Sequence, residues 1–169
     1  IDEELMNPTD RRIFAIAEAF HKDYSVDKIH DITKIDKWFL EKLSHIYQLR
    51  NELVEYNMME ELPVDKLIMA KKQGYSDFQL ARLVLKSPDT EIHNDLIKVR
   101  QYRKSQGIVP CVKQIDTLAG EYPALTNYLY LTYNGNEHDV EFKHDGQSVI
   151  VLGSGAYRIG SSVEFDWCS

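Results

Sequence analysis

The stretch that most constrains the fold is the last one, residues 148–169. It begins with an apolar, β-branched run from Val149 to Leu152, which is typical of a buried parallel strand. Gly153 and Gly155 follow, and glycines permit a tight turn from strand to helix with positive φ angles. Either of the two serines after Gly160 is a candidate cap for a short helix. A βαβ unit needs about 30 residues and a second strand to bury its apolar faces, so we expect the chain to be a piece of a larger protein.

Residues 1–107 carry the pattern of a helical array, with no strand pattern. Ser25 and Ser76 are expected to start helices whose apolar residues recur at three- and four-residue spacing, and Gly74 and Gly107 are suited to end helices. We expect residues 1–7 to be frayed and Thr9 to cap the first of about six helices. The further helices are expected at residues 26–32, 36–56, 64–73, 78–86 and 91–105.

Apolar residues at helical spacing predict which faces turn inward. Trp38 lies beside an apolar stripe of the third expected helix. We expect it to be an anchor in the core or at a helix junction, because tryptophan mostly buries area. The inward face predicted for the first helix consists of Ile13, Ile16, Ala17 and Phe20.

The character of the sequence changes after Pro110. The segment from Val112 to Ala119 is either extended or a short helix, and its pattern does not decide between the two. Residues 127–133 are rich in β-prone aromatic residues, and a turn signal at residues 134–136 follows. Residues 138–142 are a candidate return strand, which predicts a hairpin here.

We therefore expect a mainly α fold in three parts. Residues 1–107 form an irregular helical array, residues 108–147 a connector with a hairpin, and residues 148–169 a truncated α/β strand, loop and helix. No internal repeat is apparent.

The composition of this 169-residue chain excludes several classes of function. A net charge of −7 argues against a surface for nucleic acid or acidic membranes, because binding to phosphates relies on clustered Lys and Arg. No apolar run approaches the roughly 18 residues of a membrane span, and no signal segment is visible at the start. Cys111 and Cys168 lie far apart, and we expect free thiols in a reducing cytosol.

Two local patterns invite functional hypotheses that we weigh against simpler ones. Residues 76–105 resemble a DNA-binding helix-turn-helix, but their basic residues lie at the end of the second helix, and recognition helices contact bases near their start. We favour ordinary helix packing. A cluster of metal-ligand residue types is more simply a solvated hairpin. This cluster consists of His138, Asp139, Glu141, His144 and Asp145.

Several motifs resemble one enzyme family, in collinear order over nearly the whole chain. The last of them is GSGAYRIGSSVEFDWC, at residues 153–168. Before it come PTDRRIFAIAEAF, YSVDKIHDITKIDKWFLEKL, GYSDFQLARL and VKQIDTLAGEYPALTNYLYLTY. Together they resemble the large subunit of carbamoyl-phosphate synthase, from the helical domain between its two synthetase halves to the opening strand and loop of the second half. IDKWFL and RIGSSVEFDW are the most specific parts of the match.

The resemblance implies an ATP-dependent ligase as the parent enzyme. It makes carbamoyl phosphate, for pyrimidine and arginine synthesis, from bicarbonate, two ATP with Mg²⁺, and ammonia that a glutaminase subunit or domain releases from glutamine. The family's ATP-grasp active sites lie outside residues 1–169, so we expect this cytoplasmic chain to bind no ATP or metal and to catalyse nothing. Its implied role is the oligomerisation or connection domain that holds the two synthetase halves in register.

The resemblance also suggests roles for residues of the last stretch. Ser162 and Glu164 would line the internal tunnel that delivers carbamate, and Gly153, Gly155 and Gly160 would lie in a loop near the second active site. Some family members have a smaller glycine at the position of Ser162. The simpler interpretation of Glu164 is a carboxylate near a helix start.

Self-association requires an exposed apolar patch. The predicted patch consists of Met58, Met59, Leu62, Leu67, Ile68 and Met69. The rival hypotheses are a passive helical spacer that never self-associates, and a nucleic-acid-binding module with salt-dependent affinity.

Overall fold

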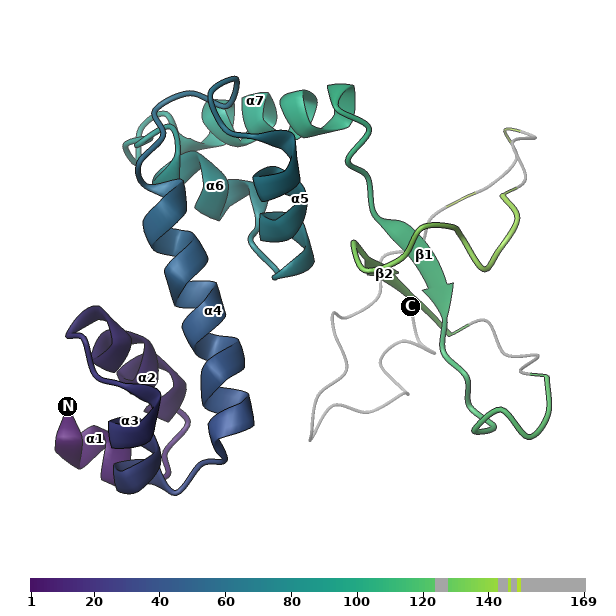
Figure 1. The fold of residues 1–169 in the computed structure, drawn as a ribbon. Coiled ribbons are helices and arrows are strands. Elements are labelled where there is room, and N and C mark those ends of the chain that lie inside the picture. The colour runs from purple at the N-terminus through teal and green to yellow at the C-terminus, as the bar shows by residue number, and fades with distance from the viewer. Residues whose placement is uncertain (124–127, 143–145, 147–148, 150–169) are drawn as a thin grey trace.

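The computed structural model describes residues 1–123, 128–142, 146 and 149, and within them the fold is mainly α (Figure 1). Helices alternate with short connections over residues 1–107, and a small sheet follows. The helices are α1 (Asp2–Met6), α2 (Arg12–His21), α3 (Val26–Thr33), α4 (Lys37–Leu53), α5 (Val64–Lys72), α6 (Asp77–Leu83) and α7 (Ile92–Ser105), and the strands are β1 (Cys111–Gln114) and β2 (Leu129–Thr132).

The long helix α4 joins two separate cores. In Figure 1, α1–α3 lie beside the first part of α4, and α5–α7 lie together near its end. We call α1–α3 with the first part of α4 the N-terminal half, and the rest of the helices the C-terminal half. The N-terminal core contains Leu5, Ala15, Ile16, Ala19, Phe20, Ile29 and Leu40. The C-terminal core contains Leu49, Leu53, Met59, Leu62, Leu67, Leu80, Val84, Val99 and Ile108, among others.

Local capping explains where several helices begin and end. Ser25 and Asp36 accept hydrogen bonds from the first-turn amides of α3 and α4. Ser76 and Gln79 form a reciprocal capping box at the start of α6. Gly74 adopts φ +96° behind α5, and Gly107 adopts φ +72° behind α7. Both glycines therefore end helices in the left-handed conformation that was predicted.

The first residues differ from the prediction. Residues 1–7 are not frayed, because Leu5 of α1 is fully buried in the N-terminal core and the Tyr24 hydroxyl donates a hydrogen bond to Asp2 at 2.9 Å. Thr9 does not cap a helix: α2 begins at Arg12, with Arg11 in the cap position and no side-chain cap. The segment is ordered although most of its residues are polar, because burial of one leucine stabilises the folded state by about 1.5–3 kcal/mol.

Two predictions of burial are also wrong. Ile13 is 48% exposed and Ala17 is exposed, whereas Ala15 and Ala19 of α2 are buried. Ile16 and Phe20 of the predicted face are buried, as expected, and contacts of α2 with both α1 and α4 place Ala15 and Ala19 in the core beside them. Trp38 is 61% exposed, because Leu40 occupies the core-facing position in the first turn of α4.

The sheet pairs different segments from those predicted. β1 and β2 are antiparallel, with Cys111 opposite Thr132 and Gln114 opposite Leu129. The first residues of the undecided segment 112–119 are therefore extended. Residues 138–142 are not a return strand. Instead, the free edge of β1 bonds to side chains: His138 accepts from the Val112 amide at 3.0 Å, and Asp139 accepts from the Gln114 amide at 2.9 Å.

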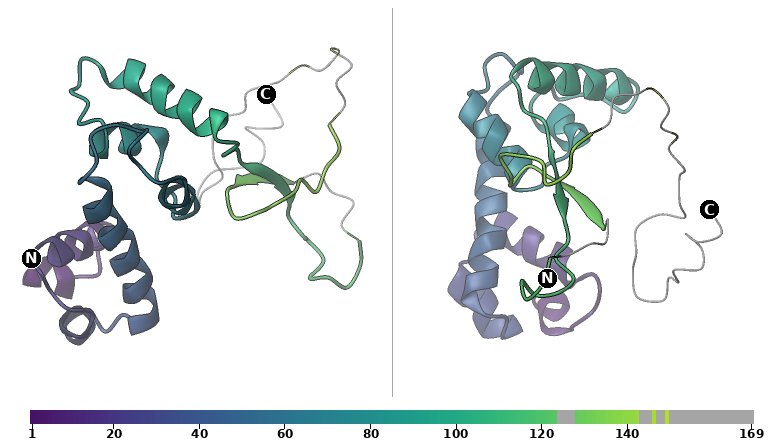
Figure 2. Two further views of the ribbon diagram at one scale, coloured as in Figure 1. Left: turned by 45° about the horizontal axis from the view of Figure 1, so that its top comes forward. Right: turned by 90° about the vertical axis from the view of Figure 1, so that its right-hand side faces the viewer.

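The small sheet lies beside the C-terminal half. Figure 1 and the left view of Figure 2 show it next to the end of α7 and away from α1–α3. The buried thiol of Cys111 is free and donates to the Gly135 carbonyl at 3.1 Å, while Cys168 lies outside the described residues. Among the described residues, no helix is long and apolar enough to cross a membrane.

Candidate functional site

An apolar groove runs between α2 and α4 on the surface of the N-terminal half. Its cavity of about 170 Å³ is also lined by Tyr75 of the C-terminal core, whose hydroxyl donates to the Ile46 carbonyl at 2.6 Å. Burial raises the pKa of Tyr75, so this hydroxyl stays protonated and remains a donor at neutral pH. The residues that line the groove are Ile13, Ile16, Ala17, Phe20, Leu43, Ile46, Tyr47, Arg50 and Tyr75.

A second, more polar cavity of about 380 Å³ continues the groove along α2. Phe14 borders it with 72% of its surface exposed. A hydrogen bond of 3.0 Å joins Nδ1 of His21 to the Tyr47 hydroxyl. Glu18 and Arg50 also line this cavity, so the rim carries one charge of each sign. An exposed apolar surface with both signs of charge at its edge is typical of a protein–protein contact.

The patch predicted from the sequence is not a continuous surface. Met59, Leu62 and Leu67 are buried in the C-terminal core, which leaves Met58, Ile68 and Met69 exposed among the predicted members. The error arises because the apolar face of α5 packs against its own domain. The α2–α4 groove was not predicted from the sequence. The number of apolar residues on α2, which exceeds what one buried face requires, was a signal for it.

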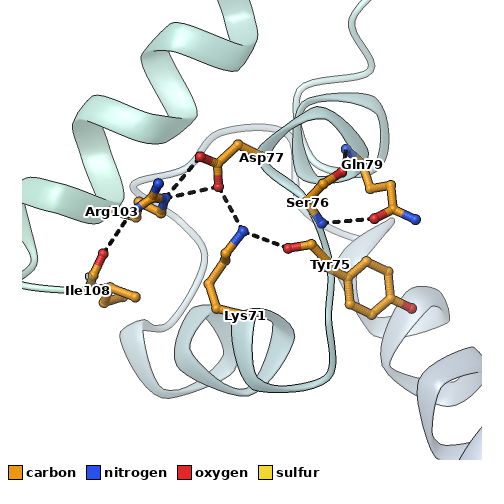
Figure 3. A network of polar contacts seen from close by, with 7 residues as sticks. All are labelled: Lys71, Tyr75, Ser76, Asp77, Gln79, Arg103 and Ile108. Atoms are coloured by element: carbon orange, nitrogen blue, oxygen red, sulfur yellow. Dashed lines mark hydrogen bonds and ion pairs between the residues drawn. The ribbon is translucent and has the colours of Figure 1, made fainter. Parts of the chain in front are cut away.

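A buried ion cluster distinguishes the C-terminal half (Figure 3). Asp77, in the first turn of α6, accepts from Arg103 Nε with both oxygens at 2.9 Å and from Lys71 Nζ at 2.8 Å. Lys71 also donates to the Tyr75 carbonyl at 2.6 Å, and Arg103 donates to the Ile108 carbonyl at 3.0 Å. We call Lys71, Asp77 and Arg103 the ion cluster. It joins α5, α6 and α7 and the start of the connector.

Tyr133 covers the ion cluster from the connector. Lys71 Nζ lies 5.0 Å and Arg103 Cζ 5.6 Å from the centroid of its ring. These distances are within the range of cation–π attraction. Burial raises the pKa of the Tyr133 hydroxyl. The cluster was not predicted, because its members lie far apart in the sequence and form no spaced motif.

The same contacts weaken the helix-turn-helix hypothesis. Of the basic residues on α7, Arg103 is buried in the ion cluster. Lys98 pairs with Asp95 at 2.8 Å. That hydrogen bond lowers the pKa of Asp95, with help from Ser87, and raises the pKa of Lys98. Arg103 thus joins α7 to Asp77 of α6, and Lys98 is paired within α7, so neither contributes an unpaired charge to a basic face.

The other predicted site residues fall into two groups. His138 and Asp139 bond to β1, and the described residues hold no group of three His, Cys, Asp or Glu side chains placed to bind a metal ion. Glu141 of the polar cluster is exposed. The remaining candidates lie outside the described residues: His144 and Asp145 of the polar cluster, and Gly153, Gly155, Gly160, Ser162 and Glu164 of the last stretch.

Comparison with known protein families explains the order of these parts. Residues 1–107 match the family described as carbamoyl-phosphate synthetase large chain, oligomerisation domain. Residues 145–169 match the family described as carbamoyl phosphate synthase preATP-grasp domain. The chain therefore belongs to the carbamoyl-phosphate synthetase large chains, of which it spans the oligomerisation domain and the start of a pre-ATP-grasp domain.

Individual relatives match over the whole chain. The multifunctional protein pyr1-3 of Dictyostelium discoideum is 52% identical over 99% of this chain and 7% of its own length. The multifunctional protein URA2 of Saccharomyces cerevisiae is 52% identical over 100% of this chain and 7% of its own length. The mitochondrial, arginine-specific carbamoyl phosphate synthase large chain of Neurospora crassa is 51% identical over 100% of this chain and 14% of its own length. The chain thus spans 7 to 14% of the length of these relatives.

Proposed function

We propose that the chain acts within a glutamine-hydrolysing carbamoyl-phosphate synthase, as the oligomerisation and connection domain between its two synthetase halves. Residues 1–107 would form that domain, residues 108–147 the connector, and residues 148–169 the start of the second synthetase half. The family match over residues 1–107 supports this assignment. The parent enzyme would form carbamoyl phosphate from bicarbonate, glutamine-derived ammonia and two ATP with Mg²⁺. Its remaining partner would be a glutaminase subunit or domain.

The segment itself is proposed to be a non-catalytic, cytoplasmic part of that enzyme. ATP and Mg²⁺ would bind in the synthetase halves, and Ser162 and Glu164 would line the tunnel between them. Titration of this chain with MgATP in a calorimeter tests whether nucleotide binds outside it. We expect no heat of binding at millimolar nucleotide, and a saturable heat would contradict the assignment of all nucleotide sites to other segments.

The observation that carries the self-association function is the α2–α4 groove. Phe14 and Ile13 expose large apolar surfaces on α2, at the edge of a groove floored by apolar side chains. Soluble proteins rarely leave such contiguous surfaces uncovered, since covering them is favourable by about 25 cal/mol per Å². A second copy of the chain is the proposed occupant.

The charges on the rim support a two-fold arrangement. A two-fold interface uses the same patch on both partners. If one residue of the patch contacts a second residue on the other copy, that second residue also contacts the first across the axis. With Glu18 and Arg50 on one patch, the glutamate of each copy can face the arginine of the other. The patch is thus self-complementary in charge, although the chain as a whole carries −7.

Sedimentation equilibrium over a wide concentration range tests this function. We expect a concentration-dependent dimer that Phe14→Glu abolishes. Arg50→Glu should weaken it by about 10-fold or more through like charges across the interface, and the double exchange Glu18→Arg with Arg50→Glu should restore it. Met58→Glu, at an exposed site of the C-terminal half, is the matched control and should have no effect. A strict monomer at high concentration would favour the passive spacer.

A further inference from the structure

We propose that Tyr133, Asn134 and Gly135 form a clasp that locks the small sheet onto the C-terminal half of the helical unit. The clasp would give the domain that begins near residue 145 a fixed orientation relative to the helices. This inference rests on the proposed connection function and adds a physical device to it. Tyr133 ends the β-prone run predicted from the sequence, and Asn134 and Gly135 belong to the turn signal predicted after it.

The charge balance of the ion cluster explains the choice of tyrosine. Lys71 and Arg103 are 7% and 8% exposed, and both pair with the single carboxylate of Asp77. Two buried cations on one anion leave one positive charge in excess, which is costly away from water. The face of an aromatic ring carries partial negative charge, and the Tyr133 ring lies within 6 Å of both cations. The ring therefore offsets part of that excess and excludes water from the cluster.

The two neighbouring residues fasten the clasp on either side of the ring. Asn134 Nδ2 donates at 3.2 Å to the carbonyl of Lys72, the last residue of α5, where helical carbonyls lack partners within the helix. The Gly135 carbonyl accepts from the Cys111 thiol. A Cβ at Gly135 would lie 3.3 Å from Cys111 Cβ and 2.9 Å from Lys113 Cε. Glycine thus permits a close approach of this backbone to β1.

Both ends of the sheet are tied to the same cations. The chain enters the sheet just after Ile108, whose carbonyl accepts from Arg103, and leaves it at Tyr133, whose ring lies against Arg103 and Lys71. A segment held at one end can pivot about that point, whereas a segment held at both ends on one rigid cluster cannot. The sheet would therefore hold the segment that follows it in a fixed orientation relative to the helices, which a flexible linker could not do.

Hydrogen exchange of the full chain, followed by mass spectrometry, tests the clasp. Tyr133→Leu keeps an apolar side chain but removes the aromatic face, and it should speed amide exchange in β1 and β2 by about 5-fold or more, the equivalent of a typical cation–π interaction. Tyr133→Phe keeps the ring and is the matched control, with exchange as in the wild type. Gly135→Ala should also speed exchange in the sheet, because its Cβ meets Cys111.

The expected pattern is confined to the sheet, with α6 and α7 unchanged and helical circular dichroism retained. Wild-type exchange in Tyr133→Leu would overturn the proposal, and so would equal acceleration in Tyr133→Phe. Sedimentation of the same variants separates this result from the self-association function. A dimer that persists while the clasp test fails removes the clasp alone, and a monomer with an intact clasp removes the self-association alone.

Discussion

The N-terminal half of the helical unit builds its core from apolar side chains and leaves apolar surface uncovered, while the C-terminal half encloses charges. Phe14, Ile13 and Trp38 are exposed in the first half. Lys71 and Arg103 are buried in the second half, where both pair with the half-buried Asp77 and lie against the ring of Tyr133. An uncovered apolar surface gains free energy from any partner that fits its shape, whereas a buried ion cluster accepts only the groups that satisfy its charges.

This difference suggests a division of labour along α4. The half with the apolar groove is suited to bind another copy, and the half with the ion cluster is suited to hold one defined segment of its own chain. Because α4 carries side chains of both cores, it keeps the two activities at a set separation. The Tyr75 hydroxyl reinforces the joint by donating to the Ile46 carbonyl in the middle of α4.

We expect the largest loss of stability from a substitution in the ion cluster, the feature that distinguishes the C-terminal half. Asp77→Asn leaves two buried cations without their anion, and removing one partner of a buried ion pair typically costs about 3–5 kcal/mol of unfolding free energy. Urea unfolding followed by circular dichroism measures this loss. Asp65→Asn, at an exposed carboxylate of α5, should stay within about 0.5 kcal/mol of the wild type. An equally small loss for Asp77→Asn would mean that water reaches the cluster and that the two halves do not differ as described.

A smaller effect compares the helix caps of the two halves. Ser25→Ala removes a single cap from α3, and we expect a loss of about 1 kcal/mol in unfolding free energy. Ser76→Ala removes the hydroxyl that accepts from the Gln79 amide and so weakens the reciprocal bond from the Ser76 amide to Gln79 Oε1. Its loss should therefore be larger, up to about 2 kcal/mol. Ser44→Ala in the interior of α4 is the control. Equal losses at Ser25 and Ser76 would show that the reciprocal bond adds nothing.

The smallest effect concerns the sheet and its dependence on pH. Hydrogen bonds from the Lys113 side chain and the Gln114 amide lower the pKa of Asp139 below its ordinary value of 3.8. A lowered folded-state pKa means that the stabilisation is complete above the ordinary value and is lost as the pH falls through the folded-state value. The Gln114 amide signal in NMR should therefore be constant above about pH 4 and should shift at lower pH.

The Lys98–Asp95 pair of the C-terminal half is the internal comparison for that titration. Its hydrogen bond likewise lowers the pKa of Asp95, so the signal of the Asp95 amide should also be constant down to the same range. A midpoint for Gln114 at or above the ordinary aspartate value would show that Asp139 is not bonded to β1 in solution. That result would leave the clasp and the bond from the Val112 amide to His138 as the ties between residues 133–142 and β1.

Features that depend on neighbours in the sequence were predicted well. Ser25, Ser76, Gly74 and Gly107 act within one helical turn of their own positions, so their roles follow from residue type and spacing. Segments that depend on distant partners were predicted poorly. α1 is short and polar and is ordered through Leu5. His138 and Asp139 bond to β1 through their side chains and through one backbone bond from the Asp139 amide to the Val112 carbonyl, and residues 138–142 form no strand.

The sequence by itself determined the mainly α character, most helix boundaries and the family, because caps, glycine positions and collinear motifs are local properties of the chain. Only the tertiary structure decided which apolar residues stay exposed and where the buried charges meet. Met59 and Leu67 lie in the core while Phe14 and Trp38 lie on the surface, although all four are apolar. The physical reason is that burial and charge pairing depend on which helices pack together, and residues as far apart as Lys71, Arg103 and Tyr133 become neighbours only when the chain has folded.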